Sequence, residues 1–313
     1  MTHLQPQTGI VEGLLTKGPW ISDLTPGQKF IGFFVARNPR LVPFKDPSNG
    51  KYLTLNLSDR TGTIQARIWE GAESISGEIN DGCVIKVDGS VEMFREEAQV
   101  HIHRVRPGRE GEFAREDFLK TSNRNTEEMW FVVQNAVQSV KNSHLAALLR
   151  YFFGSAPFAH QLLESPAARV VHHSYMYGLL EHIYELLVLA GPLLDLYPEI
   201  DKDLLVAGIL LHDIGKLEEY EVEYDITVTD IGKLIGHVVL SERLVSRAIR
   251  DIDGFPRELE LKIIHLIISH HGRLEWGAAR KPKSLEAIAL HQLDNLDAQV
   301  NRFSLLLASA HRN

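Results

Sequence analysis

Eight residues without a polar side chain, Leu204 to Leu211, lead directly into the sequence His212-Asp213-Ile214-Gly215-Lys216. This pattern is typical of a buried helix that carries titratable residues at one end. An imidazole and a carboxylate in adjacent positions can bind one divalent ion, and the second carboxylate oxygen can bridge to another ion. A buried histidine beside a helix-capping aspartate would give the same dipeptide. The dipeptide alone therefore does not distinguish a metal site from core packing, and the rest of the chain has to decide.

Similar placements recur in other apolar segments, at His182, His237, His270, His271 and Asp294. Burying so many titratable groups without partners would cost on the order of several kcal/mol each. A shared divalent metal would satisfy them together, because imidazole and carboxylate both donate lone pairs. We interpret His160, His265 and His291 as packing residues of the core and His144 as an exposed residue.

The chain of 313 residues is long enough for two domains, and its net charge of −8 is unevenly distributed. Residues 1–125 hold 16 basic and 16 acidic residues, whereas the remainder holds 17 basic and 25 acidic residues. A polycation that binds nucleic acid through bulk charge is therefore excluded.

The single cysteine, Cys83, excludes an internal disulfide and agrees with a cytoplasmic location. Neither a secretory signal nor a membrane span is expected.

The sequence pattern of residues 12–106 predicts β structure. Leu53, Leu55 and Leu57 alternate with polar residues, and a second alternating segment, 64–69, follows the turn signal at 59–62. Together with apolar segments at 30–37, 83–91 and 99–105, this predicts five short strands within residues 12–106. A closed five-stranded barrel of the OB type is the commonest such fold.

The segment Lys51 to Glu70 resembles the OB-fold modules of enzymes that act on nucleic acids. We expect Tyr52, Arg67 and Trp69 to point outward, with His101 and His103 on a later strand. Aromatic rings stack on bases and arginine neutralises phosphate, so these three residues predict contacts with single-stranded nucleic acid. They could equally close the barrel or be solvated.

Residues 107–125 predict a linker, because they contain Pro107, two glycines and mixed charges without periodicity. Residues 126–313 predict an all-α domain, since only helical patterns follow. The expected helices cover 127–151, 156–163, 173–189, 202–212, 234–249, 257–271 and 284–307.

The order His182, His212-Asp213, Asp294 resembles the metal-binding signature of the HD-domain phosphohydrolase superfamily. His237 and the pair His270-His271 resemble the additional ligands of its two-metal members. Longer strings, among them HHSYMYGLLEH (172–182), LLVAGILLHDIGK (204–216), ISHHGRLEWG (268–277) and ALHQLDNLDA (289–298), look like the YhaM-type 3′→5′ exoribonucleases, which carry an OB-fold ahead of the HD domain. This resemblance covers nearly the whole chain.

The resemblance implies hydrolysis of phosphodiester bonds of single-stranded RNA, or of single-stranded DNA, by a metal-bound hydroxide. One metal would take His182, His212, Asp213 and Asp294, and a second would share Asp213 and take His237, with His270 and His271 as ligands or supporting residues. Asp213 and Lys216 are the predicted catalytic residues, Lys216 acting on the scissile phosphate. His172, His173 and Arg273 are predicted to contact the nucleic acid.

Mn²⁺ is the favoured metal, with Fe²⁺, Co²⁺ and Mg²⁺ as alternatives. Mg²⁺ prefers oxygen ligands, which argues against Mg²⁺ as the sole ion in a site rich in histidine.

Two other functions fit parts of the sequence. A phosphohydrolase or phosphodiesterase for small or cyclic nucleotides would use the same helical domain, but it would have no need of a barrel that holds a strand. A binding module with a non-catalytic helical domain would not need the full set of metal ligands. A homo-oligomer is compatible with the sequence but is not specified by it.

Overall fold

The computed structural model describes residues 17–168 and 173–310, and it divides into two compact units. The first unit extends to Lys120 and includes the short segment Glu223–Asp225. The second comprises Thr121–Val222 and the residues from Ile226 onward. The division after Lys120 falls within the segment 107–125 that was predicted as a linker.

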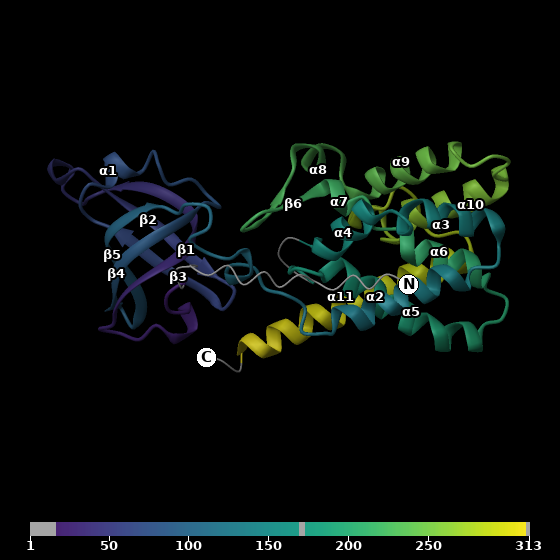
Figure 1. Cartoon of the computed structure of the whole chain (residues 1–313), viewed down its shortest axis with the longest axis horizontal. Helices are drawn as coiled ribbons and strands as arrows, with labels where there is room; N and C mark the ends of the chain where they lie inside the picture. The colour runs from purple at the N-terminus through teal and green to yellow at the C-terminus, as the bar shows by residue number, and fades with distance from the viewer. Residues whose placement is uncertain (1–16, 169–172, 311–313) are drawn as a thin grey trace. The chain divides into compact units, whose positions relative to one another are not determined.

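The first unit is a closed barrel of five strands, as predicted (Figure 1). The strands are β1 (Lys29–Pro43), β2 (Lys51–Asp59), β3 (Gly62–Ile68), β4 (Val84–Phe94) and β5 (Glu97–Pro107), in the order β1-β2-β3-β5-β4. All neighbours are antiparallel except β3 and β5, whose parallel pairing together with the β1–β4 pairing closes the barrel. A four-residue helix, α1 (Ala72–Ile75), follows β3.

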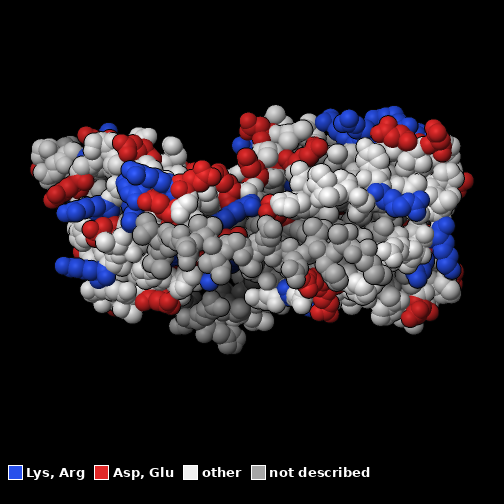
Figure 2. Space-filling view, viewed as in Figure 1, with Lys and Arg blue, Asp and Glu red and all other residues white. Residues whose placement is uncertain are grey.

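Alternation along the strands separates the barrel's core from its outer surface. Leu53, Leu55 and Leu57 on β2 are buried together with Ala66 and Ile68 on β3. The intervening side chains therefore point outward, which is the expected consequence of a side-chain period of two. On the face shown in Figure 2, Lys and Arg side chains of the barrel are interspersed with Asp and Glu. This distribution agrees with the equal numbers of basic and acidic residues in this part of the sequence.

The second unit is helical (Figure 1). Its helices are α2 (Thr126–Ser139), α3 (Ser143–Phe153), α4 (Ala156–Glu164), α5 (Gly178–Leu196), α6 (Lys202–Leu211), α7 (Lys216–Glu219), α8 (Asp230–Ile235), α9 (His237–Arg250), α10 (Arg257–Ser269) and α11 (Leu285–Ala310). None of the helices in the described part of the chain combines the length and apolar composition that crossing a membrane requires.

Two predicted helices are divided in the structure. The segment 127–151 forms α2 and α3, because the side chain of Asn142 accepts hydrogen bonds from the His144 and Leu145 amides and starts a new helix. The segment 234–249 is interrupted at Gly236, whose φ of 77° ends α8 and makes His237 the first residue of α9. A hairpin of two three-residue strands, β6 (Tyr220–Val222) and β7 (Ile226–Val228), was not predicted.

Helix α6 lies at the centre of the helical core. All eight residues from Leu204 to Leu211 are buried, and α6 contacts α2, α3, α5, α10 and α11. A helix that is apolar on every side is stable only when other elements surround it. The two residues that directly follow it, His212 and Asp213, are consequently placed in the interior of the domain.

Candidate metal centre

His212 and His270 occupy equivalent positions at the C-terminal ends of α6 and α10. The Nδ1 atom of His212 lies 2.9 Å from the Ile209 carbonyl oxygen, and that of His270 lies 2.6 Å from the Ile267 carbonyl oxygen. A carbonyl oxygen only accepts hydrogen bonds, so Nδ1 donates in both rings. Each Nε2 atom therefore keeps its lone pair for a ligand.

His182 and His237 are oriented by carboxylates instead. The Nδ1 atom of His182, on α5, lies 2.6 Å from Oδ2 of Asp297, and that of His237 lies 2.9 Å from Oε2 of Glu219. Hydrogen bonds of this kind commonly fix the tautomer and the ring orientation of metal-binding histidines. All four rings thus present Nε2 to the same interior space.

The first group of ligand atoms lies between α5, α6 and α11. Nε2 of His182 is 3.3 Å from Nε2 of His212 and 3.3 Å from Oδ1 of Asp294. Oδ2 of Asp213 lies 3.3 Å from the His212 Nε2 atom. These four residues are the ones that the family resemblance assigned to one metal.

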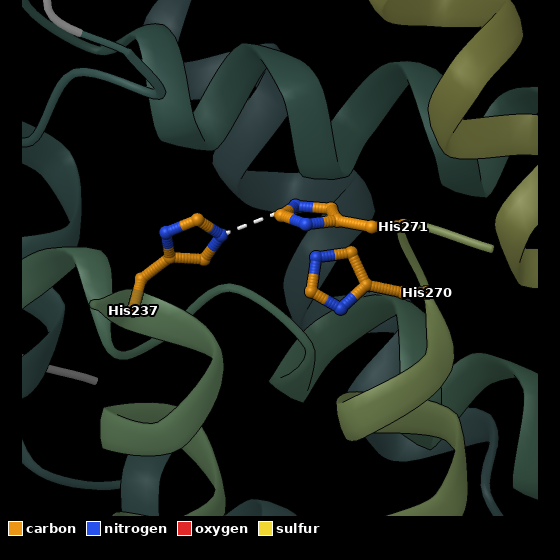
Figure 3. A group of neighbouring side chains, drawn as sticks. All are labelled: His237, His270 and His271. Carbon is orange, nitrogen blue, oxygen red and sulfur yellow. Dashed lines mark hydrogen bonds between the residues drawn. The ribbon is translucent and has the colours of Figure 1, made fainter. Parts of the chain in front are cut away.

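The second group contains the predicted residues His237, His270 and His271, whose rings converge from the start of α9 and the end of α10 (Figure 3). Nε2 of His237 lies 3.3 Å from Nε2 of His271. Oδ1 of Asp213 is 3.5 Å from Nε2 of His237 and 3.6 Å from Nε2 of His270. Asp213 therefore directs one oxygen toward each group, so its carboxylate could contact a cation held by either group.

Several atoms of this centre are buried without a hydrogen-bond partner among the described residues. They are Oδ1 of Asp213, Nε2 of His270 and Nδ1 of His271. Buried polar atoms are almost always paired in native proteins, so unpaired ones at one place point to a missing ligand. Because the nearby atoms are imidazole nitrogens and carboxylate oxygens, the donor set fits divalent metal.

The ionisation states of the groups in the centre differ from residue to residue. Burial would raise the pKa of Asp213, but the ammonium group of Lys216 and other neighbouring groups outweigh it, so that pKa lies well below its usual range. Burial would lower the pKa of His182, yet the carboxylates of Asp294 and Asp297 raise it to about 10. Burial and neighbouring histidines lower the pKa of His270 well below its usual range. The centre thus has ionised carboxylates beside at least one neutral imidazole that can coordinate metal.

Lys216 is nearly completely buried and its Nζ atom lies 2.5 Å from Oδ2 of Asp213. The ammonium group is therefore paired with the carboxylate of Asp213. Lys216 also lines a pocket of about 310 Å³ together with Asp213, His237, His271 and Asp294. A phosphate entering this pocket would meet the ammonium group and the candidate metal ligands together.

The structure adds residues that the sequence analysis did not assign to the site. Tyr220, Trp276 and His291 line the same pocket. The assignment of His291 to the core was wrong, since its ring faces this pocket and its Nδ1 atom donates to the His270 carbonyl oxygen at 2.8 Å. Asp297 and Glu219 support His182 and His237. Helical spacing was the available signal, because His291 and Asp297 lie three residues on either side of Asp294 on α11.

The predicted nucleic-acid contacts of the helical domain are not brought together. His172 lies outside the described residues. His173 is fully buried; its Nε2 atom lies 3.0 Å from Asp297 and its Nδ1 atom 2.8 Å from the Tyr175 hydroxyl. Arg273 is exposed, and its guanidinium carbon lies 4.5 Å from the ring centre of Trp276.

The outer face of the barrel carries a continuous aromatic and cationic group. The ring centres of Tyr52 and Trp69 are 4.8 Å apart, and Phe44 lies within 6 Å of both, at 5.2 and 5.9 Å. The Arg67 guanidinium carbon lies 5.5 Å from the Trp69 ring centre and 5.1 Å from that of Phe94. Tyr52, Arg67 and Trp69 therefore share one surface, and Phe44 and Phe94 are additions that the sequence did not reveal.

Comparisons with known proteins agree with both domains. Residues 42–107 match the model of the OB-fold nucleic acid binding domain, and residues 179–299 match the model of the HD domain, a metal-dependent phosphohydrolase domain. The 3′-5′ exoribonuclease YhaM of Bacillus licheniformis is 35% identical over 81% of this chain and 81% of the relative. YhaM of Bacillus subtilis shows the same identity and coverage, and YhaM of Bacillus velezensis is 36% identical over 81% of this chain and 80% of its own length. The chain therefore belongs to the YhaM family of 3′-5′ exoribonucleases, with an OB-fold followed by a divalent-metal-dependent HD domain.

Proposed function

We propose that this protein is a metal-dependent 3′-5′ exoribonuclease that hydrolyses phosphodiester bonds of single-stranded RNA. The observation that carries the proposal is the position of Asp213, with one oxygen toward each of two groups of imidazoles. Sites in which two metal ions share a carboxylate ligand are common among enzymes that cleave phosphate esters. The family membership supplies the direction of cleavage and the class of substrate.

Two divalent ions would be held by the residues predicted for them. His182, His212 and Asp294 would bind one ion, His237 with His270 and His271 the other, and Asp213 would contact both. When bound, the ions supply Lewis acidity, which lowers the pKa of a coordinated water and neutralises charge on the phosphate. We favour Mn²⁺, with Fe²⁺ and Co²⁺ as alternatives, because imidazole ligands suit these ions better than Mg²⁺.

The side chains of the centre have separate tasks. Asp297 and Glu219 hold His182 and His237 with Nε2 facing the ligand position. Asp213 stays ionised because the neighbouring ammonium group of Lys216 lowers its pKa. Lys216 forms an ion pair with that carboxylate, and from this position its ammonium group can bind a phosphate oxygen or stabilise the leaving group.

The barrel would hold the strand while the helical domain removes its terminal nucleotides. The rings of Tyr52 and Trp69 offer faces for bases, and Arg67 beside them offers charge for the backbone. Base stacking of this kind tolerates any sequence, because every base has a π-face. Single-stranded DNA is an alternative substrate, because nothing in stacking or phosphate binding distinguishes the two sugars. The cytoplasmic location and self-association stay predictions from the sequence.

The proposal is tested by comparing substrates of equal concentration. Single-stranded RNA, its DNA counterpart and a cyclic dinucleotide should each be incubated with the Mn²⁺-loaded protein and with protein treated with EDTA. We expect RNA to be cleaved fastest and all activity to be lost in EDTA. Faster cleavage of the cyclic dinucleotide than of RNA would favour a phosphodiesterase of small nucleotides instead.

A further inference from the structure

Among the described residues that line the pocket of the candidate metal ligands, one large aromatic side chain has substantial exposure. Trp276 lines this pocket and is 47% exposed. The residue ends a single 3₁₀ turn, Leu274–Trp276, which follows His271 after only two intervening residues. An indole that stays accessible in a concave site can bind a planar ligand without displacing any core residue.

The backbone holds this turn firmly. The Trp276 and Ala278 amides both donate to the Arg273 carbonyl oxygen, at 3.1 Å each, and the Ala279 amide donates to Ile268 at 2.9 Å. Gly277, with a φ of 94°, lets the chain reverse there, and a Cβ atom added to it would lie 3.4 Å from Nδ1 of His271. The indole is therefore attached to the same rigid segment as a candidate metal ligand.

The indole itself has a cationic neighbour. The guanidinium carbon of Arg273 lies 4.5 Å from the centre of the Trp276 ring, within the range of a cation–π contact. The ring of His291 approaches from within the pocket, with its centre 6.2 Å away at an angle of 50°. A flat surface that is held in place before binding loses little conformational entropy when a ligand stacks on it.

Exposure alone would prove nothing, because single apolar side chains are common on protein surfaces. Leu274 is an example: it belongs to the same turn and is 55% exposed, but it does not line the pocket. Trp276 differs in combining exposure, a position in the pocket wall and a guanidinium partner.

We propose that Trp276 forms a binding site for a nucleobase beside the metal centre, on which the base of the terminal nucleotide stacks. This inference rests on the proposed exoribonuclease function. The pocket volume of about 310 Å³ is within the range of small-molecule sites, so it can take one nucleotide unit. Stacking on an indole requires no particular pattern of donors and acceptors, so the site would accept all four bases. Trp276 would thereby place the last phosphodiester at the metal ligands.

The test uses two oligoribonucleotides that differ only in whether the 3′-terminal residue carries a base. The full-length, metal-loaded protein should be compared with Trp276→Ala, Trp276→Phe and the matched control Leu274→Ala. We expect the wild type to favour the base-bearing strand in kcat/KM by about 10-fold or more, a typical contribution of one stacked base. The ratio should fall toward one in Trp276→Ala, remain intermediate in Trp276→Phe and be unaltered in Leu274→Ala.

An equal ratio in the wild type and Trp276→Ala would overturn the proposal. A binding measurement by calorimetry separates this result from failure of the proposed function. Adenosine 5′-monophosphate should bind the wild type about 10-fold more tightly than ribose 5-phosphate, and Trp276→Ala should lose this difference. If the wild type cleaved neither strand, the exoribonuclease function would fail, and the calorimetric difference would still decide whether Trp276 binds a base.

Discussion

Nδ1 of His182 lies 2.6 Å from Oδ2 of Asp297, and the same carboxylate oxygen lies 3.0 Å from Nε2 of the buried His173. Asp297 thus connects a candidate metal ligand to a second histidine that does not reach the pocket. Both contacts are almost completely shielded from water. The orientation of the His182 ring depends on this carboxylate, because a ring without it could turn Nε2 away from the metal.

Replacing Asp297 should therefore weaken metal binding. We expect Asp297→Ala to lower the affinity for Mn²⁺ by ~10–100-fold, as is typical for the loss of a hydrogen-bond partner behind a metal-binding histidine. Asp297→Asn should lose less affinity for Mn²⁺, because the amide oxygen of asparagine can still accept a hydrogen bond from Nδ1 of His182. Calorimetric titration with Mn²⁺ measures both, with the exposed Asp195→Asn on α5 as a control. Unchanged affinity in Asp297→Ala would show that other contacts orient His182.

Gly215 should not tolerate a side chain. A Cβ atom there would lie 2.3 Å from the His237 carbonyl oxygen and 2.5 Å from the Ser241 amide nitrogen. Both are backbone atoms at the start of α9, so Gly215→Ala should push α9 and His237 away and destabilise the protein by ~1–3 kcal/mol. Urea denaturation measures the loss.

Gly191 provides the matched control, since no atom of the described residues lies within 4 Å of a Cβ atom added at this position in α5. Gly191→Ala should stabilise the protein by ~0.5–1 kcal/mol. If both variants had the same stability, the close approach at Gly215 would not constrain the fold.

Glu185 should make stability depend on pH. Burial and the neighbouring Asp297 raise the pKa of Glu185 from 4.5 to about 7, although Arg124 opposes the shift. A carboxyl group with a raised pKa in the folded state stabilises the fold fully below its unfolded pKa, and that contribution is lost as pH rises through about 7. Between about pH 5 and 7.5, the free energy of unfolding should fall more in the wild type than in Glu185→Gln. Parallel curves from urea denaturation would contradict this assignment.

The barrel surface should contribute to binding rather than to chemistry. Trp69→Ala should weaken binding of single-stranded RNA by ~1–3 kcal/mol, the contribution of one stacked base. Phe131→Ala is a suitable control, because Phe131 is 65% exposed on α2 of the helical domain. Fluorescence anisotropy with labelled RNA measures both. Equal affinities in the two variants would show that bases do not stack on this part of the barrel.

The sequence predicted the parts of the molecule that depend on local patterns. Leu53, Leu55 and Leu57 reveal a strand by alternation, and the run from Leu204 to Leu211 reveals a buried helix by its uniform apolarity. The seven candidate metal ligands could be named because titratable residues within apolar helices, or directly after them, are conspicuous. Their arrangement around Asp213 required the resemblance to a family, since spacing along the chain does not bring five helices together.

What the sequence did not reveal depends on contacts between distant segments. His291 looked like a packing residue, because its place beside Gly272 and the metal pocket arises only when α11 packs against α10. His173 looked available to a substrate, because nothing local shows that Asp297 and Tyr175 enclose its ring. The role of Glu219 follows from Gly236, which turns the chain and directs the amide and ring of His237 toward its carboxylate.

The most direct test of the account is a time course of degradation of single-stranded RNA labelled at its 5′ end, with Mn²⁺ present. The wild type should give a ladder of labelled products that shorten one nucleotide at a time from the 3′ end. EDTA or Asp213→Asn should leave the RNA intact, while circular dichroism and binding of uncleaved RNA confirm that the variant is folded. Immediate release of a short labelled product, or degradation by folded Asp213→Asn at the wild-type rate, would contradict a 3′-5′ exoribonuclease whose activity depends on the carboxylate of Asp213.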